Sequence, residues 1–275
     1  MVIALMGVVG GGSVYLVVQL VKGYMQTVRR VDLSDTADHA LRRMARDIKS
    51  ALPLSLRVKV SGGITHVEFL PVKAGGRLQY KAACFSSPGC SGLSTLGAVN
   101  NGSWVFEPGV DRLSIWNQDY GTALNCAAGD FSAWCAGTSG MTDLTPRLTS
   151  MAATGTEQAM AFATTRFSSV ADGAGTAFRV VGGPVTYVCD PVGGTLTRVW
   201  GYSLPQPVQW VGAPPSGSQQ ALLAQQVTAC DIQYDAKPSG PLGLMGRGLL
   251  SVGLRLTAQT ESVYLLVQMQ VNNAP

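Results

Sequence analysis

The fold is decided by residues 1–53, MVIALMGVVGGGSVYLVVQLVKGYMQTVRRVDLSDTADHALRRMARDIKSALP. The first 21 residues carry no charge, and an apolar run of about 20 residues can cross a bilayer as one helix. From Tyr24 onward, apolar side chains recur at steps of three and four, the period of an amphipathic helix. Pro53 stops such a helix, because proline lacks an amide donor and disfavours a helical residue before it. The sequence therefore predicts one long helix, apolar all round over residues 1–21 and amphipathic over residues 22–53.

The apolar run is the first candidate site, because an uncharged helical surface suits lipid or neighbouring helices. Its glycine triplet lowers helix propensity by roughly 1 kcal/mol per residue, which predicts a locally loosened helix. A cleavable secretory signal is the alternative, but the run lacks a basic start and a small-x-small cleavage site before a polar segment. The residues expected on this surface are Val2, Ile3, Leu5, Val8, Val9, Gly10, Gly11, Gly12, Val14, Leu16, Val17, Val18, Leu20 and Val21.

Residues 54–275 show the two-residue alternation of β-strands, interrupted by glycine- and proline-rich turns. Two alternating stretches at 250–256 and 263–271 predict a terminal antiparallel hairpin. Further strands are predicted at 56–60, 65–70, 78–82, 112–116, 160–164, 185–189, 196–202 and 228–234, with a short helix near 219–227 and long loops at 84–103 and 117–155. We therefore expect an α+β fold in which the long helix packs on one antiparallel β-sheet domain.

Composition excludes several classes of protein. Charged residues are 13% of the chain, mean hydropathy is +0.20 and the net charge is +4. So apolar a chain is not disordered, and so small a basic excess argues against nucleic acid as a partner.

Six cysteines are the second candidate site. Zinc ligands usually stand two to four residues apart with histidines nearby, and the close pairs here are more widely spaced. Fifteen disulfide pairings remain open to six cysteines, and we expect three of them in an oxidising compartment. The expected pairs are Cys84–Cys90, Cys126–Cys135 and Cys189–Cys230.

The basic residues Lys22, Arg29 and Arg30 follow the apolar run and favour a cytoplasmic domain by the positive-inside rule. The cysteines favour an oxidising compartment on the opposite side of the membrane, and we expect the domain to lie on that side.

Signatures of catalysis are missing from the sequence. It contains no G-x-S-x-G, P-loop or H-E-x-x-H motif, and its two histidines, His39 and His66, fall on the predicted helix and a predicted strand. We therefore expect no catalytic residue, no cofactor and no metal site. A binding site is the stronger alternative, because aromatic and amide or carboxylate side chains share the second long loop and suit a sugar or calcium. The candidates are Trp116, Asn117, Asp119, Tyr120 and Trp134.

A lipid-length helix, its amphipathic continuation, a proline stop and a cysteine-bearing antiparallel domain together resemble a type IV pilin or pseudopilin. More specific blocks are similar to MshO-type minor pilins of the mannose-sensitive haemagglutinin (MSHA) pilus. These blocks are YMQTVRRVDLSDTADHALRRMARDIKSALPLSLRV (24–58), HVEFLPVKAGGRLQY (66–80), YVCD (187–190), TLTRVWGY (195–202), ACDIQY (229–234) and ESVYLLVQMQVNNAP (261–275). Residues 84–155 match nothing in that family.

The resemblance implies a non-catalytic subunit held in the bacterial inner membrane by residues 1–21, with a periplasmic domain. Such a subunit joins other minor and major pilins through its helix, uses the inner-membrane assembly machinery, and initiates or caps a pilus that also serves adhesion. The family's basic leader and Phe-Thr-Leu-x-Glu stretch are not within this sequence; we expect the true start to lie upstream, and their roles are not carried over. The alternatives are a minor pseudopilin of type II secretion and a tip-located ligand-binding adhesin.

Overall fold

A computed structural model gives the structure of the chain. It describes residues 2–79, 81–97, 99, 105–115, 133–135, 147–154, 157–167, 177–202, 208–235 and 247–272. Within these ranges, the side chains at 3–5, 8–10, 135, 153–154 and 247 lie outside the description.

One helix dominates the N-terminal part, as the sequence predicts. Helix α1 runs without a break from Val2 to Lys49 over 48 residues, straight through the glycine triplet that predicted a loosened segment. It ends four residues before Pro53, earlier than expected, because the following backbone pairs with a distant segment: the Leu52 amide donates to the Leu70 carbonyl (2.7 Å) and the Val72 amide to the Ser50 carbonyl (2.7 Å). Tertiary pairing therefore ends the helix before the proline does.

Two antiparallel sheets enclose the C-terminal half of α1. The larger has the order β1-β2-β9-β10-β11, built from β1 (Arg57–Ser61), β2 (Ile64–Phe69), β9 (Val185–Asp190), β10 (Thr195–Trp200) and β11 (Gln219–Gln225). The smaller has the order β12-β13-β14, built from β12 (Val227–Asp235), β13 (Arg247–Ala258) and β14 (Glu261–Asn272). The last two strands form the predicted hairpin, with Ala258 opposite Glu261.

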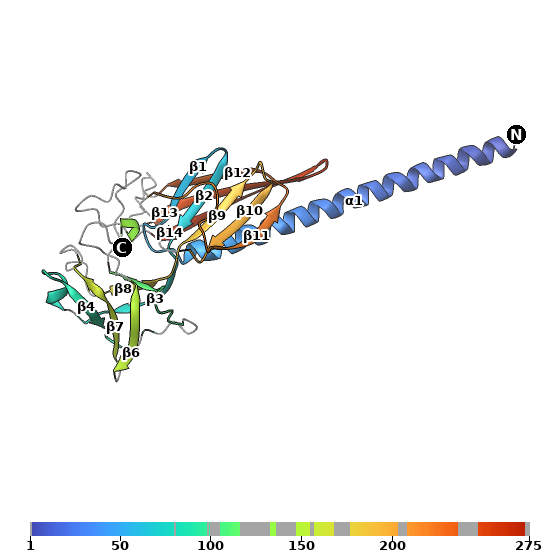
Figure 1. The fold of residues 1–275 in the computed structure, drawn as a ribbon. Coiled ribbons are helices and arrows are strands. Elements are labelled where there is room, and N and C mark those ends of the chain that lie inside the picture. The colour runs from blue at the N-terminus through green and yellow to red at the C-terminus, as the bar shows by residue number, and fades with distance from the viewer. Residues whose placement is uncertain are drawn as a thin grey trace, which may run out of the picture.

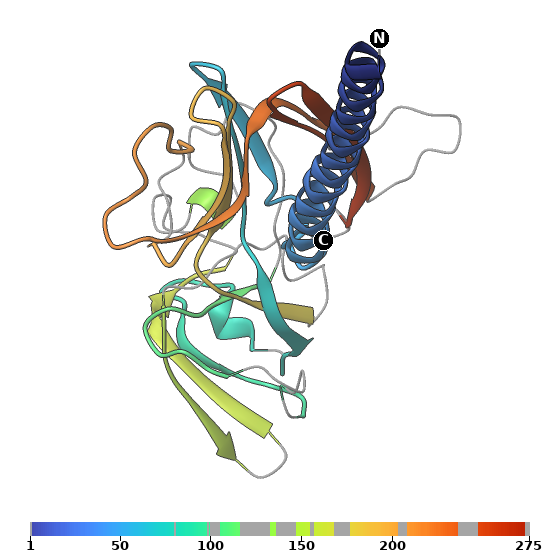
Figure 2. The same cartoon turned by 90° about the vertical axis from the view of Figure 1, so that its right-hand side faces the viewer.

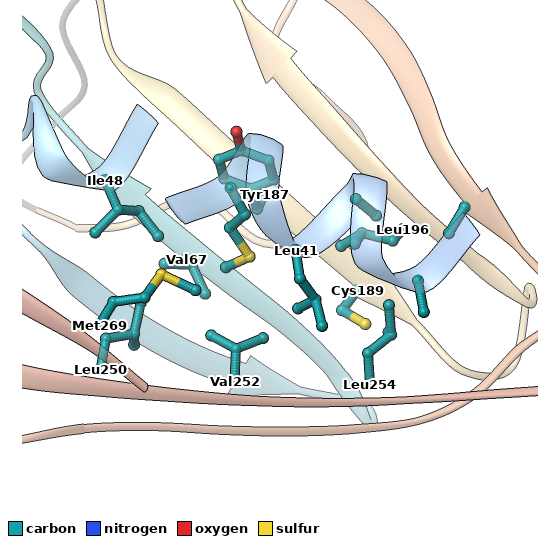
Figure 3. Packing of buried hydrophobic residues seen from close by; sticks show 14 of the residues in the cluster. Leu41, Ile48, Val67, Tyr187, Cys189, Leu196, Leu250, Val252, Leu254 and Met269 are labelled. Atoms are coloured by element: carbon teal, nitrogen blue, oxygen red, sulfur yellow. The ribbon is translucent and has the colours of Figure 1, made fainter. Parts of the chain in front are cut away.

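The helix supplies one face of the main core. Its buried side chains pack with both sheets. In Figure 3 Leu41 lies among Tyr187 and Cys189 on β9 and Val252 on β13. Each such fully buried aliphatic side chain stabilises the fold by about 1.5–3 kcal/mol. The predicted stripe is confirmed from Ala37 to Leu52, at Ala37, Leu41, Met44, Ile48 and Leu52, all 1% exposed or less.

The N-terminal end of the predicted stripe is different. Tyr24 is 70% and Val31 is 52% exposed, and Leu33 is the first buried apolar residue among the described side chains of α1. The expectation that the amphipathic half packs from Tyr24 onward is wrong. The helix reaches the sheets only near Arg30, which pairs with Glu261 at the start of β14, and it projects beyond them, as Figure 1 shows.

Two smaller sheets make a second lobe, which lies below the first in both Figure 1 and Figure 2. Their orders are β3-β8-β5 and β4-β7-β6. The strands are β3 (Val72–Arg77), β4 (Cys90–Ser94), β5 (Arg112–Ser114), β6 (Leu148–Thr154), β7 (Glu157–Thr165) and β8 (Ala177–Val181). This lobe has its own core, in which Phe162, Phe167 and Phe178 are buried. Two single-turn 3₁₀ helices, Ala82–Cys84 and Ala133–Cys135, complete the described elements.

Local predictions are wrong at four places. Strands β4 and β6 lie within residues 84–103 and 117–155, where long loops were expected. Residues 219–227 form strand β11 and its turn, where a short helix was expected, because pairing with β10 overrides the helix propensity of this segment. The described residues of 78–82 form no strand: Leu78 makes an isolated bridge to Thr95, and Ala82 begins the 3₁₀ helix Ala82–Cys84.

Candidate functional site

The most distinctive surface is the part of α1 that extends beyond the sheets. We define it as the projecting helix, Val2–Thr27. Its described side chains are all exposed, and they include large apolar ones: Val14 (64%), Tyr15 (64%), Leu16 (64%), Val17 (58%), Val18 (42%), Leu20 (74%), Val21 (52%), Tyr24 (70%) and Met25 (50%). Soluble monomers rarely expose so continuous an apolar surface, so the projecting helix is the candidate interaction surface.

The predicted members of this surface fall in two groups. Val2, Gly11, Gly12, Val14, Leu16, Val17, Val18, Leu20 and Val21 are described and exposed. For Ile3, Leu5, Val8, Val9 and Gly10 the structure describes a helical backbone, and their side chains lie outside the described set. A Cβ atom added at Gly11 or Gly12 would meet nothing within 4 Å, so no contact within the described chain requires these glycines.

Among the described residues, no helix is both long enough and apolar enough to cross a membrane.

A charged cluster fastens the other half of α1 to the five-stranded sheet. The Asp47 carboxylate accepts hydrogen bonds from the Tyr187 hydroxyl (2.8 Å) and from Arg198 Nε (2.7 Å), and pairs with Arg43 one helical turn earlier (3.3 Å). Burial raises the pKa of Tyr187 above its usual range, and the Asp47 charge adds to this. The cluster fixes the rotation of the helix on the sheet. The sequence analysis did not identify this cluster, although the position of Asp47 beside the buried stripe of α1 was a signal of a charged contact with the sheet.

Two predicted disulfides are confirmed. Cys84–Cys90 closes a small loop in the second lobe, and Cys189–Cys230 joins β9 of the five-stranded sheet to β12 of the three-stranded sheet. The second bond therefore links two sheets on either side of the core. Cys126 lies outside the described residues, so the expected Cys126–Cys135 pairing lies outside them too.

Most of the predicted ligand loop also lies outside the described residues, namely Trp116, Asn117, Asp119 and Tyr120. Trp134 is described and is 3% exposed. Its indole N–H donates to the Ser55 carbonyl (3.0 Å), and the Arg57 guanidinium lies 3.8 Å from the centre of its ring. The Trp134 ring thus packs into the fold beneath Arg57.

A second buried cluster supports that region. The Glu68 carboxylate is fully buried, where it pairs with Arg57 and accepts a hydrogen bond from the Tyr202 hydroxyl (2.8 Å). Tyr202 and His66 both meet the Trp210 ring edge-to-face, at 6.2 and 5.1 Å between ring centroids. Within the described ranges, no group of His, Cys, Asp and Glu is arranged to hold a metal ion. Through Glu68, these contacts tie Arg57 of β1 and Tyr202, just after β10, to β2.

The sequence matches no family model, no curated protein and no solved structure.

Proposed function

We propose that the chain is a non-catalytic minor pilin that takes part in the assembly of an MSHA-like type IV pilus, in its initiation or tip complex. One observation carries the proposal. A single 48-residue helix packs into the main core along its C-terminal half, and it exposes large apolar side chains along its projecting half. A surface of this kind needs either lipid or other apolar helices around it. Because lipid tails and apolar helices offer similar surroundings, transfer from one to the other is nearly neutral in free energy.

The proposed partners follow from this surface. Before assembly, residues 1–21 lie in the bacterial inner membrane and the remaining chain lies in the periplasm; afterwards the subunit is at the cell surface. The partners are other minor and major pilins, the inner-membrane assembly machinery and the lipid bilayer, with no nucleic acid. The two disulfides support an oxidising compartment such as the periplasm.

Two other functions share the same helix. A minor pseudopilin of type II secretion would use the projecting helix in the same way, in a short periplasmic filament. A tip-located adhesin would add a ligand site to the assembly role, and the two roles are compatible.

Deletion of the gene separates these functions. Surface pili are counted by electron microscopy and secreted enzymes are assayed in the same strain, with a complemented strain as control. The proposal predicts loss of pili with secretion intact. Normal pili with failed secretion would replace it by the pseudopilin, and normal pili with impaired adhesion would replace it by the adhesin.

A further inference from the structure

The part of α1 that packs on the sheets carries charge that is divided along its length. Residues 32–38 include three aspartates and no basic side chain, whereas residues 42–49 include four basic side chains and one aspartate. That aspartate, Asp47, already binds Tyr187 and Arg198 of the five-stranded sheet. We define an acidic segment, Asp32, Asp35 and Asp38, and a basic segment, Arg43, Arg46 and Lys49.

All six side chains of the two segments reach solvent. The side chain of Asp38 is 45% exposed and pairs with Arg42, four residues later in the helix. The side chain of Arg43 is 47% exposed and pairs with Asp47. The other four residues are exposed and make no ion pair within the described part of the chain. They are Asp32, Asp35, Arg46 and Lys49.

The two segments match at a spacing of eleven residues, because each aspartate stands eleven positions before a basic residue. Eleven residues make about three helical turns, so both members of a match lie on the same side of α1, about 16 Å apart along its axis. The matched residues therefore cannot meet within one helix. A second, parallel helix displaced by about 16 Å brings all three matches together. The matches are Asp32 with Arg43, Asp35 with Arg46, and Asp38 with Lys49.

The same charges disfavour a parallel pair without the displacement, because aspartates would then face aspartates and arginines would face arginines. An antiparallel pair would also match opposite charges, with Lys49 opposite Asp32. It would, however, point the two projecting helices in opposite directions. Helices that enter one membrane or one filament from the same side run parallel, so the choice of a parallel pair rests on the proposed function.

We propose that α1 docks in parallel onto a second copy of this chain, displaced by about 16 Å along the helix axis, with the acidic segment of one copy against the basic segment of the other. This contact uses different surfaces of the two copies, so each copy keeps one free segment and a third copy can add in the same way. Exposed ion pairs are individually weak and are screened by salt. The charges therefore set the axial alignment, and the apolar projecting helices hold the copies close.

Carbodiimide coupling, which joins a carboxylate directly to a lysine amine, tests this proposal on the full chain in neutral detergent. Asp38 and Lys49 lie about 16 Å apart along one helix, so an amide between them can form only between two copies. We expect a covalent dimer whose digest contains the Asp38–Lys49 amide, as mass spectrometry will identify. The yield of this amide is expected to fall as salt is added.

Variants test the alignment of the charges. Arg46→Glu places a carboxylate opposite Asp35 of the other copy and is expected to lower the yield of the Asp38–Lys49 amide at least about fivefold. Adding Asp35→Lys to Arg46→Glu reverses the charges of this pair and is expected to restore the yield. Arg77→Glu, at an exposed position of β3, is the matched control and is expected to couple as the parent does. Circular dichroism checks that each variant folds.

Three results would overturn the proposal. They are the absence of a covalent dimer, a dimer joined through Asp32 and Lys49, which marks the antiparallel pair, and an unchanged yield of the Asp38–Lys49 amide in a folded Arg46→Glu variant. The pilus count of the deletion strain does not depend on these results. A failure here therefore removes the contact between copies and leaves the assembly role to its own test.

Discussion

Replacing Asp47 by alanine is the sharpest test of how α1 is held on the five-stranded sheet. The substitution removes the acceptor of the Tyr187 hydroxyl and the partner of Arg198. Asp38→Ala is the matched control, because Asp38 pairs with Arg42 one turn away on the same helix and both side chains are exposed. Both variants change aspartate to alanine inside α1, so the change in helix propensity is the same.

The expected magnitudes differ because the two pairs differ in exposure. Removing one partner of a fully buried ion pair costs about 3–5 kcal/mol. Arg198 and Asp47 are 15% and 16% exposed, so the lower end applies, and the stranded Tyr187 hydroxyl adds about 1–3 kcal/mol. These losses overlap, and we expect Asp47→Ala to lower the free energy of unfolding by about 3–5 kcal/mol. For the exposed Asp38–Arg42 pair we expect about 0.5 kcal/mol or less.

Urea-induced unfolding, followed by near-ultraviolet circular dichroism of the full chain in neutral detergent, measures both variants. A double-mutant cycle with Arg198→Ala isolates the Asp47–Arg198 interaction and is expected to give more than about 1 kcal/mol of coupling. Asp47→Ala and Asp38→Ala agreeing within about 1 kcal/mol would refute the assigned role of the cluster.

Three further predictions concern the disulfide between the sheets and two buried titratable groups. Replacing Cys189 and Cys230 by alanine is expected to lower the free energy of unfolding by about 4 kcal/mol, because the bond spans a sequence separation of 41; unchanged urea unfolding would contradict this. Burial, and then the Glu68 charge, raise the pKa of Tyr202 above its unfolded value of 10.0. The contribution of neutral Tyr202 to the free energy of unfolding is therefore complete below that pH, and above it this contribution falls by about 1.4 kcal/mol per pH unit. Tyr202→Phe should make the free energy of unfolding fall less steeply at alkaline pH. Burial lowers the pKa of His66 below 6.5, so stability is complete above that pH and falls as the pH drops. His66→Gln should reduce the loss between about pH 7.5 and about pH 5.5 in unfolding titrations, and an unchanged loss would show that His66 is not the group responsible.

The helix and its buried stripe were predictable because they repeat locally. Leu41, Met44 and Ile48 recur with helical spacing, and all are buried in the main core. The helix end was not predictable from that spacing, since it depends on backbone bonds from residues 50 and 52 to residues 70 and 72. The same holds for residues 219–227, whose helix propensity is overridden by pairing with β10.

The candidate sites divide in the same way. The apolar run of the projecting helix is continuous in sequence, so its exposed residues from Val14 to Val21 could be named in advance. The charged cluster of Asp47 could not, because Tyr187 and Arg198 lie 140 and 151 residues away in the sequence and meet Asp47 only through the packing of α1 on the five-stranded sheet.

In-cell photo-crosslinking from a single position of the projecting helix tests the central claim most directly. A photoreactive residue is placed at Leu16, which is 64% exposed, and for comparison at Val192, which is 87% exposed in the turn between β9 and β10. If α1 is the assembly surface, Leu16 yields adducts with other pilin subunits and Val192 does not. Adducts of equal yield from both positions, or none from Leu16 in piliated cells, would contradict the account.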